Sequence, residues 1–186
     1  MGRMTFHPTP IAGLCEIRHA SSGDARGRFT RLFCEQGLAA IRPGLHFTQI
    51  NLSQTHGLGT LRGVHYQLPP AAEAKLIHCL RGRVFDVAVD VRAGSPTFLH
   101  WHAIELSEDG NNAVFIPEGV AHGFQTLSEE AWLLYMHTTP WAPACEAGFR
   151  HDDPRLLIDW PLPVGTLSVR DRGYPLIDDA FTGVVA

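Results

Sequence analysis

The sequence predicts an all-β fold, a sandwich or a barrel, and three observations lead to this prediction. Short apolar runs are separated by clusters of Gly, Pro, Asn and Asp along most of the chain. Two runs, 84–92 and 132–138, show the period of two that places alternate side chains on opposite faces of a strand. The candidate strands recur at intervals of roughly 8–12 residues, which is typical of sandwiches and barrels.

Seven strands are expected in order along the chain. The pattern is clearest in the fourth, where Phe85, Val87, Val89 and Val91 share one face and polar residues or Ala occupy the other. Turn-forming residues separate neighbouring strands at 68–70, 81–83, 92–96, 108–112 and 117–119. The expected strands are 47–53, 59–67, 74–80, 84–92, 99–106, 113–116 and 132–138.

Helical pattern is scarce, and we expect only short helices. Residues 34–41 suit one or two helical turns, and 150–158 suit another. From Pro140 onward the chain contains more Pro and Asp and alternates less. We therefore predict a single domain over 1–186, with a β core at about 45–140 and an irregular C-terminal arm at about 141–186.

The composition narrows the functional classes. An apolar fraction of 45% supports a packed core, and a net charge of −4 without long charged runs argues against general nucleic-acid or membrane-surface binding. The apolar runs are too short and too often broken to predict a transmembrane helix, and the first residues lack the build of a secretory signal. The four cysteines are scattered without CxxC spacing, which favours reduced thiols and a cytoplasmic protein.

Three side chains suggest proton-transfer chemistry. His65 shares a strand face with Gly63, which leaves room for a ligand, and an imidazole takes up and releases protons near neutral pH. Lys75 is the single lysine in a chain with fourteen arginines, and a hairpin would bring it beside His65, where an ammonium can stabilise an enolate oxygen. Tyr135 is a candidate acid, because a phenol can donate a proton to a carbanion from the face opposite the base. Taken singly, each residue also suits a structural role.

An ordered set of motifs makes the chain resemble the dTDP-4-dehydrorhamnose 3,5-epimerases and their relatives in unusual-sugar pathways. The resemblance extends from about Arg26 to Asp171 and depends on the order of the whole set. The motifs are Asp24-Ala-Arg-Gly-Arg-Phe29, Gln49-Ile-Asn51 with Ser53, Leu61-Arg-Gly-Val-His-Tyr-Gln67, Lys75-Leu76, Asp86-Val-Ala-Val-Asp-Val-Arg92 with Ser95-Pro96, Pro117-Glu-Gly-Val-Ala-His-Gly-Phe124, Asp153-Pro154, Asp159-Trp-Pro161 and Ser168-Val-Arg-Asp171.

The resemblance implies a cupin-type jelly-roll β-barrel, usually a homodimer, that epimerises a 4-keto-6-deoxy sugar nucleotide at carbon 3, carbon 5 or both. No metal or other cofactor is implied. His65 would be the base, oriented by Asp171, while Lys75 would neutralise the enolate oxygen and Tyr135 would be the acid. The positions that match sugar-nucleotide contacts in the family are Arg26, Gln49, Asn51, Arg62, His122, Trp141, Glu146 and Arg170.

Three residues depart from the family pattern, all toward the nucleotide end of the site. Arg31 stands where the family often has Glu, Met136 replaces a Lys or Arg, and Trp141 replaces a base-stacking tyrosine. The nucleotide base therefore stays open, as does the choice between single and double epimerisation.

Three other functions stay open. In a metal-dependent cupin, His100, His102, Glu105 and His122 would be the ligands, although Glu105 falls on the opposite strand face from the two histidines. A non-catalytic carbohydrate-binding jelly roll would need no His65, Lys75, Tyr135 and Asp171 set. A 3,4-ketoisomerase would move the carbonyl group of a sugar nucleotide instead of inverting a carbon.

Overall fold

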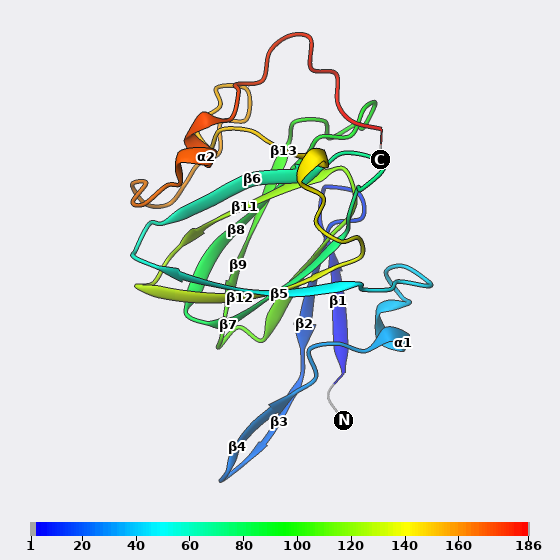
Figure 1. Ribbon diagram of the computed structural model, residues 1–186. Helices are drawn as coiled ribbons and strands as arrows, with labels where there is room; N and C mark the ends of the chain where they lie inside the picture. The colour runs from blue at the N-terminus through cyan, green and yellow to red at the C-terminus, as the bar shows by residue number, and fades with distance from the viewer. Residues whose placement is uncertain (1–2, 186) are drawn as a thin grey trace.

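The computed structural model describes residues 3–185 and consists of two antiparallel β-sheets packed face to face, with few helices (Figure 1). From the fifth strand onward the chain passes repeatedly from one sheet to the other, as in a jelly roll. The prediction of an all-β, cupin-type jelly roll with short helices is confirmed.

The larger sheet has six strands. In spatial order they are β1 (Met4–Pro8), β2 (Cys15–His19), β10 (Asn112–Ile116), β7 (Lys75–Arg81), β12 (Glu130–His137) and β5 (Gln49–His56). Its first two strands come from the N-terminal segment, ahead of the 45–140 region in which the core is expected. Both strands alternate apolar and polar residues, but each spans only five residues, and neither was predicted from the sequence.

The smaller sheet has five strands. In spatial order they are β13 (Glu146–Gly148), β6 (Leu61–Gln67), β11 (Val120–Thr126), β8 (Arg83–Asp90) and β9 (Trp101–Ser107). All seven expected strands are present in the two sheets, with shifted ends, whereas β11 and β13 of the smaller sheet were not expected. Because all seven of its residues are buried, β11 lacks the half-polar pattern of a surface strand.

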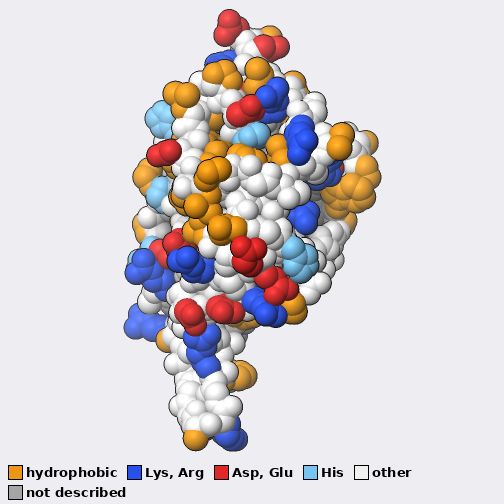
Figure 2. Space-filling model, turned by 90° about the vertical axis from the view of Figure 1, so that its left-hand side faces the viewer, with side chains coloured by type: hydrophobic (Ala, Val, Ile, Leu, Met, Phe, Trp, Pro, Cys, Tyr) orange, Lys and Arg blue, Asp and Glu red, His pale blue; other side chains and the backbone are white. Residues whose placement is uncertain are grey.

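The remaining elements lie outside the two sheets. Strands β3 (Ser21–Asp24) and β4 (Gly27–Thr30) form a hairpin that projects from the body of the molecule (Figures 1 and 2). Helix α1 (Glu35–Leu38) lies within the expected 34–41 helix, a 3₁₀ turn covers Pro143–Cys145, and α2 (Val169–Gly173) lies near the C-terminus.

The helix expected at 150–158 is wrong. This segment forms turns because Pro154 disfavours helical geometry at the residue before it, and Leu157 adopts a positive φ of 50°. The buried Asp153 carboxylate accepts hydrogen bonds from the backbone amides of Arg155 and Ile177, so it holds the turn against the C-terminal segment.

Three apolar clusters stabilise the fold. One fills the space between the sheets and includes Ile77, Phe124 and Leu133. A second, on the outer face of the smaller sheet, is covered by residues of the C-terminal segment such as Leu156 and Ile177. A third lies on the outer face of the larger sheet, under α1 and the loop that follows it. The C-terminal arm therefore packs directly on the barrel.

Surface charge is mixed on the face shown in Figure 2, where acidic and basic side chains interleave. Within residues 3–185, none of the helices is long and apolar enough to cross a lipid bilayer.

Candidate active site

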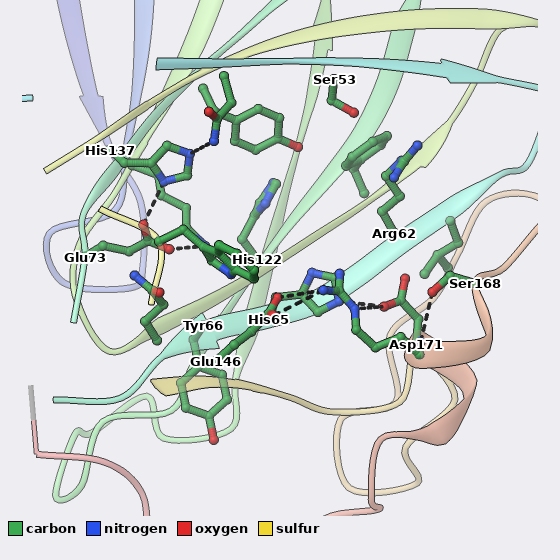
Figure 3. A pocket seen from close by; sticks show the side chains of 18 of the residues that line it. Ser53, Arg62, His65, Tyr66, Glu73, His122, His137, Glu146, Ser168 and Asp171 are labelled. Carbon is green, nitrogen blue, oxygen red and sulfur yellow. Dashed lines mark hydrogen bonds and ion pairs between the residues drawn. The ribbon is translucent and has the colours of Figure 1, made fainter. Parts of the chain in front are cut away.

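A cavity of about 510 Å³ opens at one end of the barrel, between the two sheets (Figure 3). Strands β5, β6, β7, β11 and β12 supply its walls, and the C-terminal region closes one side. The volume of the cavity falls in the range of small-ligand pockets. Ten of the twelve residues expected in the site line it. They are Asn51, Arg62, His65, Lys75, His122, Tyr135, Trp141, Glu146, Arg170 and Asp171.

His65 and Asp171 form a hydrogen-bonded pair, with 2.7 Å between His65 Nε2 and Asp171 Oδ1. Asp171 lies in the first turn of α2, whose N-cap Ser168 accepts a hydrogen bond from the Asp171 amide. Burial raises the pKa of Asp171, but the hydrogen bond and charge of His65 outweigh it and hold the pKa below its usual value. Because an ionised carboxylate only accepts, Nε2 carries the proton and Nδ1 is left to act as a base.

Gly63 determines how closely the strand that carries His65 approaches its neighbour. Its φ is +113°, and a Cβ atom there would lie 2.5 Å from Gly123 Cα and 2.7 Å from the His122 carbonyl oxygen. The β6–β11 register shifts beside this contact, and His122 lies directly opposite His65. Only glycine fits, so Gly63 and Gly123 together place the two imidazoles across from each other.

His122 and Tyr135 form the wall of the cavity behind His65. The His122 imidazole lies 2.8 Å from the buried Asp86 carboxylate and packs edge-on against Tyr135, with 5.8 Å between ring centroids. Burial, with a smaller contribution from the Asp86 charge, raises the pKa of Tyr135 well above its ordinary value. The phenol therefore stays protonated and can serve as a proton donor.

Lys75 is buried at the inner end of the cavity, where its ammonium lies 3.2 Å from Glu73. Glu73 also accepts a hydrogen bond from His137 Nδ1 at 2.7 Å. Burial raises the pKa of Glu73, but His137 and Lys75 outweigh it and hold the pKa below normal. The cavity thus contains an ammonium held in place by a buried carboxylate.

The mouth of the cavity is lined by longer and more exposed side chains. Arg170 pairs with Glu146 at 3.0 Å, and Arg62 donates to Thr55 at 3.0 Å. Trp141 is 57% exposed at the rim. These groups suit an anionic, partly aromatic ligand.

Two expected site residues lie outside the set that lines the cavity. Gln49 is adjacent to it, because its side chain contacts both Asn51 and the backbone amide of Trp141. Arg26 lies at the tip of the β3–β4 hairpin, where its side chain is 90% exposed and pairs with Asp24. Within the described chain, the hairpin does not bring Arg26 to the cavity.

The metal-cupin ligand set is not brought together. His100 precedes β9 and is exposed, while His122 is already paired with Asp86. Across residues 3–185, no cluster of three or more His, Cys, Asp or Glu side chains is arranged to hold a metal ion.

Sequence reasoning missed two carboxylates of the site. Glu73 is two residues before Lys75, and this spacing on an extended chain could have placed both side chains in the same cavity. Asp86 shares its strand face with Ala88, which pairs with His122. That alternation could have identified Asp86 as an inward-facing carboxylate.

The chain is similar to proteins of one family over almost its whole length. Residues 8–179 match the family model of dTDP-4-dehydrorhamnose 3,5-epimerase. A dTDP-4-dehydrorhamnose 3,5-epimerase of Sinorhizobium fredii is 39% identical over 94% of this chain and 90% of its own. A dTDP-4-dehydrorhamnose 3-epimerase of Streptomyces niveus is 39% identical over 95% of this chain and 86% of its own.

Solved structures agree with the sequence comparisons. NovW, a 4-keto-6-deoxy sugar epimerase from the novobiocin gene cluster of Streptomyces spheroides, superposes with a TM-score of 0.89 at 39% identity, covering 94% of this chain and 87% of its own. The Legionella pneumophila dTDP-6-deoxy-D-glucose-3,5-epimerase, in complex with dTDP-4-keto-L-rhamnose, gives 0.91 at 37% identity, covering 99% and 100%. The expected family is confirmed: this chain belongs to the dTDP-4-dehydrorhamnose 3,5-epimerase family of isomerases.

Proposed function

We propose that the protein epimerises a 4-keto-6-deoxy sugar nucleotide of the dTDP-4-keto-6-deoxyglucose type at carbon 3, carbon 5 or both, in deoxysugar or rhamnose biosynthesis. The observation that carries this proposal is that His65, Lys75 and Tyr135 line one cavity, with the imidazole oriented by Asp171. Each of the three comes from a different strand, so the barrel itself sets their spacing.

The 4-keto group acidifies the hydrogens on carbons 3 and 5. His65 takes one of them as a proton, and the electron pair of the broken C–H bond moves into an enolate whose oxygen faces Lys75. Tyr135 then donates its proton to the carbanion centre from the opposite face. Solvent reprotonates the phenolate and removes the proton from His65. These steps transfer protons only, so they require no metal or redox cofactor.

The mouth of the cavity suits the nucleotide. Arg62 and Arg170, which line the cavity, would bind the diphosphate, for which guanidinium contacts are strong, and the exposed Trp141 would stack on the base. Gln49, Asn51, His122 and Glu146 supply hydrogen bonds to the remainder of the ligand. The protein would work in the cytoplasm, where its four free cysteines stay reduced.

A second copy of this chain would cover the outer face of the larger sheet. Exposed apolar side chains lie there on β5 and β7, the two strands that flank β12, among them Ile50, Leu52 and Leu80. A surface of this kind marks an interface, and a homodimer would bury it. Light scattering after gel filtration tests this inference: twice the chain mass supports the dimer, and a monomer for the wild-type protein contradicts it.

Incubation with dTDP-4-keto-6-deoxyglucose in heavy water tests the proposed reaction. We expect deuterium to enter carbon 3, carbon 5 or both, and NMR to show an inverted centre. Binding without label in the sugar would instead indicate a non-catalytic protein, and a shifted carbonyl would indicate a ketoisomerase. Either result would overturn the proposal.

A further inference from the structure

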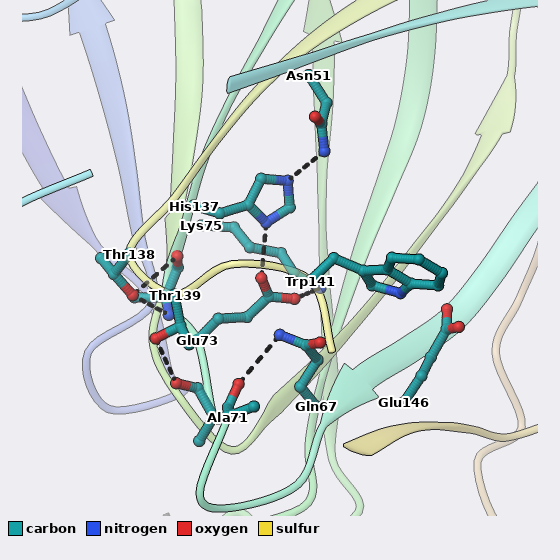
Figure 4. Close-up of polar contacts among 12 residues, drawn as sticks. Asn51, Gln67, Ala71, Glu73, Lys75, His137, Thr138, Thr139, Trp141 and Glu146 are labelled. Carbon is teal, nitrogen blue, oxygen red and sulfur yellow. Dashed lines mark hydrogen bonds and ion pairs between the residues drawn. The ribbon is translucent and has the colours of Figure 1, made fainter. Parts of the chain in front are cut away.

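A hydrogen-bonded chain of side chains joins the nucleotide end of the cavity to Lys75 (Figure 4). Its centre is Glu73, whose two carboxylate oxygens accept from Lys75 and from His137. The segment before β7 that carries Glu73 is held rigidly, because Thr138 accepts from the Ala74 amide and Gln67 donates to the Ala71 carbonyl. The proposed epimerase mechanism uses Lys75 but assigns no role to Glu73 or His137.

The orientation of the side-chain amides can be derived from the rim of the cavity. The backbone N–H of Trp141 only donates, so the Gln49 atom that it contacts at 3.1 Å is Oε1. Gln49 Nε2 therefore faces Asn51 and donates to Asn51 Oδ1 at 3.3 Å. That in turn leaves Asn51 Nδ2 facing His137 Nε2 at 3.4 Å. A donor thus faces this ring nitrogen, so Nε2 must be an unprotonated acceptor.

The other end of the hydrogen-bonded chain identifies the state of the second ring nitrogen, Nδ1. The Glu73 side chain is only 7% exposed, lies beside Lys75 and has its pKa held below normal, so it is ionised and only accepts. His137 Nδ1 therefore carries the proton of the 2.7 Å contact. A protonated Nδ1 at this end and an unprotonated Nε2 at the Asn51 end together describe a neutral His137. Every donor from Trp141 to His137 points in the same direction, toward Glu73.

We propose that His137 is a positioning residue. Neutral and protonated at Nδ1, it links two groups: the Glu73 carboxylate, which orients Lys75, and the side-chain amides of Asn51 and Gln49 at the nucleotide end of the cavity. That one end of this chain contacts the nucleotide and the other holds Lys75 beside the enolate oxygen rests on the proposed function. The hydrogen-bonded chain itself does not depend on that function, because it follows from the contacts alone.

Protonation of His137 breaks this chain. Nε2 then becomes a donor that faces the Asn51 amide, and the contact survives only if Asn51 and Gln49 both turn, which removes the acceptor of the Trp141 amide. The ionisable groups around His137 are Glu73 and Lys75 on one side and Tyr135, whose ring stacks on it at 5.9 Å, on the other. His122 lies behind Tyr135.

The first test measures the tautomer directly in the ligand-free protein. Long-range ¹H–¹⁵N NMR spectra at neutral pH, with His137 assigned by comparison with His137→Asn, should show a protonated Nδ1 and a bare Nε2. An Nε2-protonated ring or an imidazolium at neutral pH would overturn the inference. Because this measurement needs no substrate, it gives its answer even if the proposed function fails.

The second test separates the two contacts of His137 with a matched pair of variants. In His137→Asn the amide takes the place of Nδ1 and keeps a donor for Glu73, whereas in His137→Gln it takes the place of Nε2 and keeps a partner for Asn51. His137→Asn should weaken dTDP binding by about three- to tenfold, the effect of one lost hydrogen bond, with little change in the deuterium exchange rate at saturation. His137→Gln should leave dTDP binding nearly unchanged and lower the deuterium exchange rate at saturation.

The pattern of these two variants decides between positioning and a merely structural role. Equal losses of affinity and rate in both variants would overturn the inference. If the wild-type protein binds dTDP but exchanges no deuterium, the proposed function fails, while the NMR result and the dTDP affinities still test the hydrogen-bonded chain.

Discussion

Three imidazole–carboxylate pairs lie in or behind the cavity wall, and their histidines differ in solvent exposure. The pairs are His65–Asp171, His137–Glu73 and His122–Asp86. His65 is the most exposed of the three, with 21% of its side chain accessible, compared with 12% for His137 and 6% for His122. A base that exchanges protons with substrate and solvent needs such access, whereas a buried pair is better suited to holding geometry. At the residue scale, exposure therefore separates His65, the proposed base, from the two other histidines.

Asp171→Asn tests the orientation of the base. The amide retains the shape of the carboxylate but no longer stabilises a proton on His65 Nε2 as an ionised acceptor does. We expect kcat to fall by about 10²–10⁴-fold, the range of general acid–base catalysis. Asp90→Asn is the matched control, because Asp90 is buried outside the cavity and should affect stability only. An Asp171→Asn enzyme with wild-type kcat would contradict the assignment.

Tyr135→Phe tests the acid. Deuterium should still exchange at the carbon from which His65 abstracts, while inversion slows by about 10²-fold or more, on the scale of a lost catalytic acid. NMR of the product in heavy water measures both quantities. Since the pKa of Tyr135 is raised well above its ordinary value, the wild-type rate should not fall through phenol ionisation at pH 9. Equal losses of exchange and inversion would count against Tyr135 as a separate acid.

The sequence predicted site residues better than it predicted their partners. His65, Lys75 and Asp171 were expected from the ordered motifs and Tyr135 as a candidate acid on the 132–138 strand, and all four line one cavity. The contact between Glu73 and His137 was not expected, because it joins a loop to a strand 64 residues away, and no local pattern encodes such a pairing.

At the scale of elements, the β3–β4 hairpin separates Arg26 from the cavity of its own chain. Within the described residues, β3 and β4 pair as strands only with each other, and the hairpin projects from the barrel (Figure 1). If Arg26 contacts the nucleotide as its motif implies, the hairpin must deliver it to the cavity of a second copy. This places a site residue on the partner in the proposed homodimer.

Mixed dimers test this arrangement. Arg26→Ala and His65→Ala homodimers should each have low activity at substrate concentrations below KM. Because a mixed dimer would join the intact His65 of one chain to the intact Arg26 of the other, one of its two sites should recover wild-type kcat/KM. Co-expression with two different tags and tandem purification isolates this species. A mixed dimer no more active than the two parents would show that Arg26 does not act across the interface.

The elements differ in how well the sequence predicts them, for physical reasons. Strands such as β8 and β12 alternate or carry long apolar runs, so their period is visible. Buried on both faces, β11 has no alternation to detect. A helix was expected at 150–158, but the Asp153 side chain accepts a hydrogen bond from the Ile177 backbone amide, and Pro154 disfavours a helix there.

At the scale of the whole molecule, two buried histidines should make stability depend on pH. His19 and His78 pack with their ring centroids 5.2 Å apart, and His78 Nε2 and both His19 ring nitrogens are buried without a hydrogen-bond partner in the described structure. Burial, with a smaller contribution from the His19 charge, lowers the pKa of His78 to about 3. Burial also lowers the pKa of His19.

The sign of the effect follows from proton binding. Between pH 6.5 and about 3 the unfolded chain protonates His78 and the folded protein does not, so stability falls as the pH falls through this window. From pH 7 to pH 5 the free energy of unfolding should drop by roughly 2 kcal/mol because of His78. Urea denaturation of wild type and His78→Leu at both pH values measures this. An equal drop in both proteins would contradict the prediction.

The central claim is that an imidazole and an ammonium act on one ketone inside the barrel. Deuterium wash-in from heavy water into dTDP-4-keto-6-deoxyglucose, compared between wild type, His65→Ala and Lys75→Ala, tests it most directly. We expect both variants to bind dTDP with nearly wild-type affinity and to lose exchange by about 10²–10⁴-fold. Exchange near the wild-type rate in either variant would contradict the account.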